Sequence, residues 1–144
     1  MPIDQIDRFL SSDLQKFQIV IGSREAPGSR RIGEPFVRHM MGRVFNFVVR
    51  LVGVKFNDTQ CGFKCFIGFK AHKLFELQRL NGFGSDVEIL YLARTFKLNV
   101  IEIPIDWYYR TGSKVRPGID SLRMLRDLAT IKLNDLLGRY RNSV

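Results

Sequence analysis

Two short apolar segments, far apart in the sequence, set the fold class of this chain. QIVIG at 18–22 is an apolar run closed by a glycine, which is typical of a buried strand. NVIEIPIDWYY at 99–109 is a second strand candidate, and Pro104 inside it indicates an edge or a bulge, because proline has no N–H to donate to a ladder. Helical segments surround both strands, so we expect an α/β fold.

Helices account for most of the remaining chain, which at 144 residues and 45% apolar content is long enough for one domain with its own core. Apolar spacing predicts helices over 3–14, 38–54, 82–99 and 119–137, and a shorter helical patch over 69–78. The segments 23–35 and 110–118 have the composition of loops. With only two or three convincing strands, the sheet is expected to be incomplete and to leave an open edge.

Charge is unevenly distributed along the chain, whose formal net charge is +9. Residues 22–55 hold seven Lys or Arg against two acids, and residues 110–144 hold eight against three, whereas 56–109 is balanced. An anionic partner is therefore expected: phosphate groups, nucleic acid or an acidic membrane surface. The chain does not open like a signal peptide, and no stretch is long and apolar enough to span a bilayer, so no transmembrane span is expected.

The segment NDTQCGFKCF at 57–66 places polar and charged side chains between two apolar runs, which indicates a site. Its two cysteines, Cys61 and Cys65, are too few for a disulfide-built fold or for a four-ligand zinc site. We therefore expect no metal site in this segment and interpret the cysteines as small, partly buried side chains.

Two arginine-rich segments are candidates for phosphate binding. GSREAPGSRR follows the first strand, where ligands of α/β proteins bind, and Arg24, Arg30 and Arg31 could pair with a phosphate; a solvated basic loop is the alternative. The apolar helix predicted over 38–54 carries three arginines, as a helix in a membrane interface does, or as a core helix with a few exposed cations does.

Two further segments carry groups suited to catalysis. Asp86 and Glu88 could act as acid or base, but Ser85 and Glu88 also have the spacing of a capping box, and Asp86 could complement the helix dipole. Ser113 and Lys114 lie in a glycine-containing loop that could close over an anionic substrate or be a solvated turn.

Taken together, the motifs resemble one enzyme family. QIVIGSR, RHMMGRVFN, DTQCGFK, SDVEILYLA and EIPIDWYYRTGSKV are similar to the C-terminal half of family-2 glycosyltransferases that act on polyprenyl phosphates, above all the dolichyl-phosphate β-glucosyltransferase group. The resemblance covers nearly the whole chain. It implies a GT-A fold and inverting transfer of a hexose, glucose from UDP-glucose, to a polyprenyl or dolichyl phosphate.

The resemblance also implies roles for individual residues. The acceptor phosphate is assigned to Arg24 and Arg38, with Arg31 of the same basic loop. The catalytic candidates are Asp58, Asp86 and Glu88, and the pocket and lid candidates are Thr59, Gln60, Lys64, Ser113 and Lys114. The helices from Arg38 and from Ile119 would lie against the membrane, so the expected location is peripheral, on the cytoplasmic face of a membrane, and a homo-oligomer is a further candidate partner.

One part of the family pattern has no counterpart here. The D-x-D turn that holds a divalent metal, Mg or Mn, and the nucleotide diphosphate does not occur in the sequence. We therefore expect residues 1–144 to be a single domain, the acceptor-side part of a partial GT-A fold, a fragment whose donor half and metal ligands lie outside it and whose activity alone is in question.

A function of another class is a small basic binding module without catalysis, for a membrane surface or nucleic acid. The sequence pI near 10.0 motivates it. Nucleic acid is not expected as a partner, because no familiar reading motif is present and the basic residues border apolar helices.

Overall fold

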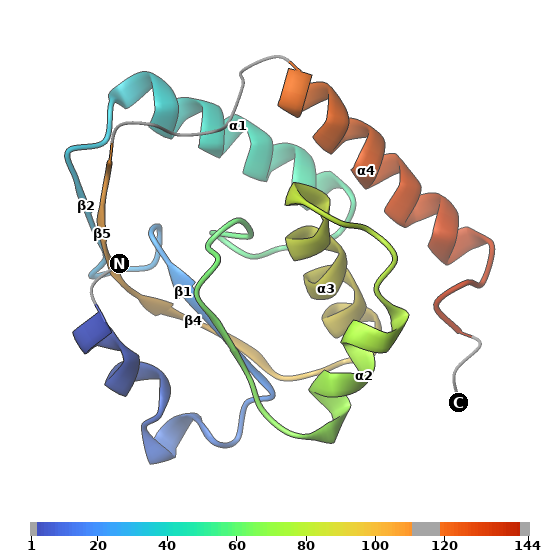
Figure 1. The fold of residues 1–144 in the computed structure, drawn as a ribbon, viewed down its shortest axis with the longest axis horizontal. Helices are drawn as coiled ribbons and strands as arrows, with labels where there is room; N and C mark the ends of the chain where they lie inside the picture. The colour runs from blue at the N-terminus through green and yellow to red at the C-terminus, as the bar shows by residue number, and fades with distance from the viewer. Residues whose placement is uncertain (1–2, 111–118, 142–144) are drawn as a thin grey trace.

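The computed structural model describes residues 3–110 and 119–141 of the chain (Figure 1). Its elements, in chain order, are the 3₁₀ helices η1 (Ile3–Phe9) and η2 (Ser12–Leu14), β1 (Ile19–Ser23), β2 (Arg30–Ile32), α1 (Phe36–Leu51), β3 (Lys64–Phe66), α2 (Phe69–Leu77), α3 (Phe83–Thr95), β4 (Val100–Pro104), β5 (Asp106–Tyr108) and α4 (Ile119–Leu136). The α/β fold class is therefore confirmed, whereas the GT-A assignment stays a prediction.

The main sheet has three strands in the order β3-β1-β4. β1 runs parallel to β4, with Ile19 opposite Val100 and Ser23 opposite Pro104, and antiparallel to β3. β2 and β5 form a separate parallel pair. The small sheet agrees with the expected shortage of strands.

Two predictions about strands need correction, and one further strand was not predicted. The segment 99–109 is not one strand, since it divides at Ile105 into β4 and β5, which pair with different partners. The predicted loop 23–35 contains β2, and the motif 57–66 ends in β3. Both missed strands are three residues long, too short for a pattern of alternating burial to be recognised.

The N-terminal segment is 3₁₀-helical rather than α-helical. Among its apolar side chains Phe9 and Leu14 are buried, whereas Ile3, Ile6 and Leu10 are exposed. Tertiary contacts explain the difference: the ring of Phe9 meets Phe63 edge-on with centroids 4.3 Å apart, and the amide of Gln5 exchanges hydrogen bonds with the backbone of Asp106.

The other predicted helices are present with shifted ends. α1 begins after Pro35 and is followed by Gly53 at φ +98°, a left-handed conformation that ends helices. α3 ends earlier than predicted, because Lys97 adopts φ 53°. α4 spans Ile119–Leu136, close to the predicted 119–137.

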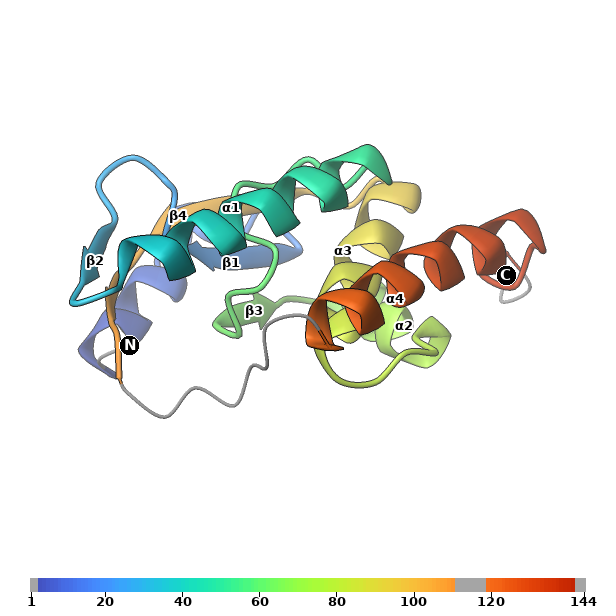
Figure 2. The same cartoon turned by 90° about the horizontal axis from the view of Figure 1, so that it is seen from above.

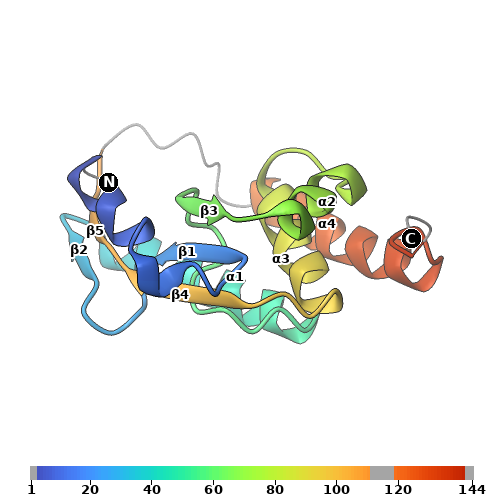
Figure 3. The same ribbon diagram turned by 90° about the horizontal axis from the view of Figure 1, so that it is seen from below.

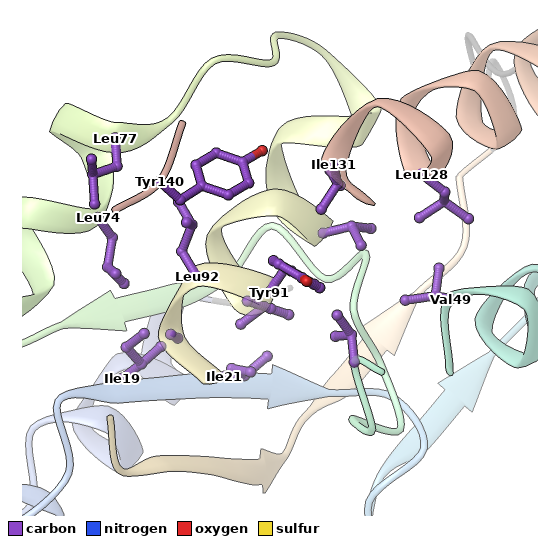
Figure 4. Packing of buried hydrophobic residues seen from close by; sticks show 14 residues of the cluster. Ile19, Ile21, Val49, Leu74, Leu77, Tyr91, Leu92, Leu128, Ile131 and Tyr140 are labelled. Atoms are coloured by element: carbon purple, nitrogen blue, oxygen red, sulfur yellow. The ribbon is translucent and has the colours of Figure 1, made fainter. Parts of the chain in front are cut away.

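Two buried clusters hold the layers together. Ile19 and Ile21 of β1 pack with residues of α1, α3 and α4 in the larger cluster (Figure 4). Val20, between them, points to the opposite face and packs with Phe9 and Ile105. Figures 2 and 3 show these layers: α1 lies on one side of β1 and β4, and the N-terminal 3₁₀ helices on the other. Burial on both faces explains why β1 is continuously apolar.

Truncating a buried leucine should destabilise the fold far more than truncating an exposed one. Leu92 in α3 is fully buried, whereas Leu136 at the end of α4 is 83% exposed. We expect Leu92→Ala to lower the free energy of unfolding by about 3 kcal/mol through lost burial and a residual cavity, and Leu136→Ala to change it by less than about 0.5 kcal/mol. Urea denaturation measures both. Equal effects of the two substitutions would contradict this packing.

Candidate functional site

The loop that follows α1 carries three of the predicted site residues, Asp58, Thr59 and Gln60, and two polar side chains hold its backbone. The carboxylate of Glu102 in β4 accepts hydrogen bonds from the backbone N–H groups of Asn57 and Asp58 at 2.9–3.0 Å. The side-chain amide of Asn46 in α1 donates to the carbonyls of Phe56 and Asn57 at 3.0 and 2.9 Å. A loop whose polar backbone groups are satisfied in this way presents its side chains in one geometry.

The predicted pocket residues Thr59 and Gln60 fasten this loop to two helices. The hydroxyl of Thr59 donates to Asn46 Oδ1 at 3.2 Å, and Thr59 is 1% exposed. Gln60 donates through Nε2 to the carbonyl of Phe83, the first residue of α3, at 3.1 Å. Both side chains therefore have structural partners, and their contact with a ligand stays a prediction.

Asp58 and Arg24 form the central ion pair of the site. Arg24 follows directly on the last residue of β1, and its Nε and Nη2 donate to the two carboxylate oxygens of Asp58 at 2.6 and 2.8 Å. Its backbone N–H donates to Asp58 Oδ2 at 2.9 Å, and its guanidinium lies 5.3 Å from the centroid of the Trp107 ring. Two parallel hydrogen bonds and a stacked ring fix the guanidinium plane.

The charges of this pair are set by their surroundings. Burial by itself would raise the pKa of Asp58, but its hydrogen bonds with Arg24 and the charge of Arg24 outweigh burial and hold that pKa below its usual value. Asp58 is 4% exposed and stays ionised with both oxygens occupied. This geometry favours a role in positioning Arg24 over proton transfer, and the catalytic assignment of Asp58 stays a prediction.

The other two predicted phosphate-binding arginines, Arg31 and Arg38, lie near Arg24 and share Glu34 as an ion-pair partner. Arg31 donates through Nε to the carbonyl of Arg24 at 3.3 Å and forms ion pairs with Glu25 and Glu34. Arg38 Nε lies 3.7 Å from Glu34 and is more exposed, at 35% of its side chain. Arg31 is thus already paired with two carboxylates, whereas Arg38 remains accessible to a ligand.

Lys64, the first residue of β3, pairs with Asp86 of α3. Lys64 Nζ donates to Asp86 Oδ1 at 2.6 Å and to the carbonyl of Cys61 at 2.5 Å. The lysine side chain is 4% exposed and the aspartate side chain 35%. They line a cavity of about 190 Å³ between β3, α2 and α3.

Glu88 lies in the core, and its contacts overturn the predicted capping box. Its carboxylate, fully buried, accepts from the backbone N–H groups of Arg79 and Leu80 at 3.0 and 2.7 Å and from the hydroxyl of Tyr140 at 2.7 Å. Ser85 instead donates to the carbonyl of Gly82 at 2.6 Å. Because α3 begins at Phe83, Ser85 is already inside the helix. This placement favours a structural role for Glu88 over the catalytic one.

The structure tests the prediction for the two cysteines but not the one for the lid loop. Cys61 is buried and Cys65 half-buried, and both are free thiols, as interpreted from the sequence. Burial, with the nearby Asp58 carboxylate, raises the pKa of the Cys61 thiol. The predicted lid residues Ser113 and Lys114 lie outside the described residues.

Sequence reasoning missed four residues that support the site. Glu102 and Asn46 anchor the loop, and Glu25 and Glu34 hold the arginines. A signal existed for Glu102, since it is charged within an otherwise apolar strand and therefore needs a partner. The two acids of the basic segment were counted only as charge, because sequence does not show which arginine each one meets.

Removing the carboxylate charge of Asp58 should destabilise the fold. Asp58→Asn leaves Arg24, 18% exposed, without its counter-charge, so we expect a loss of about 3 kcal/mol at pH 7. Because the pKa of Asp58 is lowered in the folded state, its contribution is present above the usual carboxyl pKa of about 3.9 and is lost as the pH falls below it. The difference between wild type and variant should therefore shrink in acid.

The matched control is Asp106→Asn, because Asp106 pairs at 3.5 Å with Arg30, whose side chain is 76% exposed. Such a pair contributes about 1 kcal/mol or less. Urea denaturation at several pH values measures both substitutions. A loss for Asp58→Asn no larger than for Asp106→Asn, or independent of pH, would contradict a buried ion pair.

Comparisons with known proteins give the family context of this geometry. No protein-family model matches the chain. The dolichyl-phosphate beta-glucosyltransferase of Saccharomyces cerevisiae is 37% identical over 138 residues, which cover 92% of this chain and 41% of the yeast protein. The Drosophila melanogaster enzyme of that name is 39% identical over 125 residues, with coverages of 85% and 38%. The Homo sapiens enzyme of that name is 34% identical over 145 residues, with coverages of 96% and 44%.

The chain thus spans about two fifths of the length of these curated relatives. The resemblance inferred from the motifs is confirmed for that segment. This chain is therefore a sequence relative of one segment of these dolichyl-phosphate beta-glucosyltransferases, consistent with a fragment of a family-2 glycosyltransferase.

Proposed function

We propose that this chain forms the acceptor side of an enzyme that transfers glucose from UDP-glucose to dolichyl phosphate with inversion. The observation that carries the proposal is the fixed guanidinium of Arg24 at the end of β1, held by Asp58 and stacked on Trp107. Ligands of open α/β sheets bind beyond the carboxyl ends of their strands. The sequence similarity to enzymes named for this activity supports the same assignment.

The proposed chemistry asks for positioning more than for proton transfer. An oxygen of the dolichyl phosphate attacks the anomeric carbon of glucose, a new carbon–oxygen bond forms on the opposite face, and UDP leaves with the electrons of the broken bond. The attacking oxygen is already anionic, so no strong base is required. Arg24 and Arg38 would orient the phosphate, since pre-oriented cations are the main source of catalysis in such transfers.

The donor nucleotide and a divalent metal, Mg or Mn, have no evident place among the described residues. Within 3–110 and 119–141, no three His, Cys, Asp or Glu side chains gather as a metal site would require, and Asp58 is already engaged by Arg24. We propose that metal and nucleotide are held by residues other than these. When bound, such a metal would offset the charge of the diphosphate.

A membrane surface is the proposed second partner, at the cytoplasmic face. α1 exposes an apolar stripe: Phe36, Val37, Met40, Met41, Val44, Phe47 and Leu51 are each 40–75% exposed. α4 exposes apolar residues too, among them Leu122 and Leu136. Such faces, flanked by arginines, suit helices that lie in a bilayer interface. No helix in the described part of the chain is long and apolar enough to cross a bilayer.

Loss of the Arg24 guanidinium should abolish most transfer. The test replaces the matching segment of the yeast relative with this chain and assays transfer from UDP-glucose to dolichyl phosphate. We expect Arg24→Lys, which keeps the charge beside Asp58 but not the bidentate geometry, to lower kcat/KM about 100-fold.

Arg30→Ala is the matched control, since that side chain is 76% exposed, and should leave transfer unchanged. Circular dichroism confirms that each variant is folded. No transfer by the unaltered chimera, or full activity of Arg24→Lys, would overturn the proposal.

A charge on the apolar stripe of α1 should weaken membrane binding. We expect Phe47→Glu to reduce flotation of the chain with vesicles of phosphatidylcholine and phosphatidylserine by several-fold, because the stripe would no longer enter the interface. Phe69→Glu in α2 is the control, as Phe69 is also exposed, at 80%, but lies away from α1. Salt-sensitive binding to DNA without vesicle binding would favour the nucleic-acid module instead.

A further inference from the structure

The pair of Lys64 and Asp86 is built unlike the surface ion pairs of this protein. Only 4% of the lysine side chain is exposed, although a buried ammonium is costly unless it is well paired. Its Nζ is held by two acceptors, Asp86 Oδ1 and the carbonyl of Cys61. A charge buried with this geometry fixes the position of its partner.

One oxygen of the Asp86 carboxylate is available to a ligand. Lys64 occupies Asp86 Oδ1, while no donor among the described residues reaches Oδ2. Asp86 is 35% exposed and lies in the first turn of α3 on the wall of the cavity of about 190 Å³. Oδ2 is therefore a fixed hydrogen-bond acceptor that a ligand in the cavity can reach.

The cavity combines this acceptor with an apolar wall. Phe66 and Phe75 line it, with ring centroids 4.7 Å apart in an edge-to-face arrangement, and Gln78 lines it beside them. The amide nitrogen of Gln78 is used by the carbonyl of Ser85, at 3.1 Å. Aromatic surface with a few placed polar groups is the usual composition of a small-molecule pocket, and the volume suits a single ring rather than a nucleotide.

The cavity lies near the Arg24 site. Cys61, whose carbonyl holds Lys64, lies close enough to Asp58 and Arg24 for their charges to affect its thiol. A ring bound in the cavity would thus lie near the guanidinium of Arg24. A phosphate held by Arg24 and a ring held in the cavity could therefore be the two substrates of one transfer.

We propose that Lys64 is a positioning residue that fixes Asp86 as the hydrogen-bond acceptor for a hydroxyl of a hexose ring bound in this cavity. The inference rests on the proposed function, because it assigns the transferred glucose to this subsite. Asp86 then acts on the sugar as a hydrogen-bond acceptor and not as a base, and Lys64 acts only through Asp86.

The binding experiment uses the 144-residue chain labelled with ¹⁵N and titrated with methyl β-D-glucopyranoside. We expect amide shifts at Gly62, Lys64, Gln78 and Asp86, and binding at least tenfold weaker for Asp86→Ala, since a hydrogen bond to a charged group is lost. Tetrahydropyran, the ring without hydroxyls, should bind equally to wild type and to Asp86→Ala. Glu76→Ala is the control: this carboxylate of α2 is 57% exposed and does not line the cavity.

Further variants separate positioning from a merely structural role. Lys64→Met should weaken glucoside binding, Lys64→Arg should restore part of it, and Lys64→Met should add almost nothing in the Asp86→Ala background, because residues that act through one another are not additive. Circular dichroism checks folding. Absent shifts in the folded chain, unchanged binding by Asp86→Ala, or additive losses would overturn the proposal.

The yeast chimera keeps this inference distinct from the proposed function. If the chimera transfers glucose while Asp86→Ala and Lys64→Met retain full kcat/KM, only the subsite is wrong. If the chimera transfers none while the chain binds the glucoside through Asp86, the transferase assignment fails and the sugar site stands.

Discussion

The buried ion pair between Arg24 and Asp58 organises the whole functional face, because it joins two segments that the sheet alone would leave apart. Arg24 continues β1, whereas Asp58 belongs to the loop after α1, 34 residues later. The pair holds only because Glu102 and Asn46 fix the backbone of that loop. A charge pair left without such support would not offset its loss of hydration. The geometry of the site thus depends on polar groups beneath the surface as well as on those that a ligand would meet.

Around this pair, some polar groups are hydrogen-bonded within the protein and stabilise the fold, whereas others remain available to a ligand. Glu88 and Asn46, which are buried, and Glu102, which is half-buried, have their hydrogen bonds within the protein. Arg38 and one oxygen of Asp86 are among the groups that a ligand can reach. Two such groups near the loop 57–64 suit a reaction that brings two substrates together and excludes misaligned ones.

Sequence patterns predicted the long elements and missed the short ones, for a physical reason. α1, α3 and α4 repeat their apolar spacing over several turns, so the pattern is unambiguous. β2 and β3 have three residues each and depend on partners far along the chain. The same limit explains the capping box: Ser85 and Glu88 have the right spacing, but the start of α3 at Phe83 and the hydroxyl of Tyr140 decide where Glu88 lies.

By itself, the sequence determined the α/β class, the continuous burial of β1, the basic segments and the family to which the motif DTQCGFK points, because each depends on residue types at short spacing. The tertiary structure alone decided how the charges pair. It gave Asp58 to Arg24, Arg31 to Glu25 and Glu34, and Lys64 to Asp86. A charge senses neighbours within a few ångströms in space, at any distance along the chain, and no local pattern records those contacts.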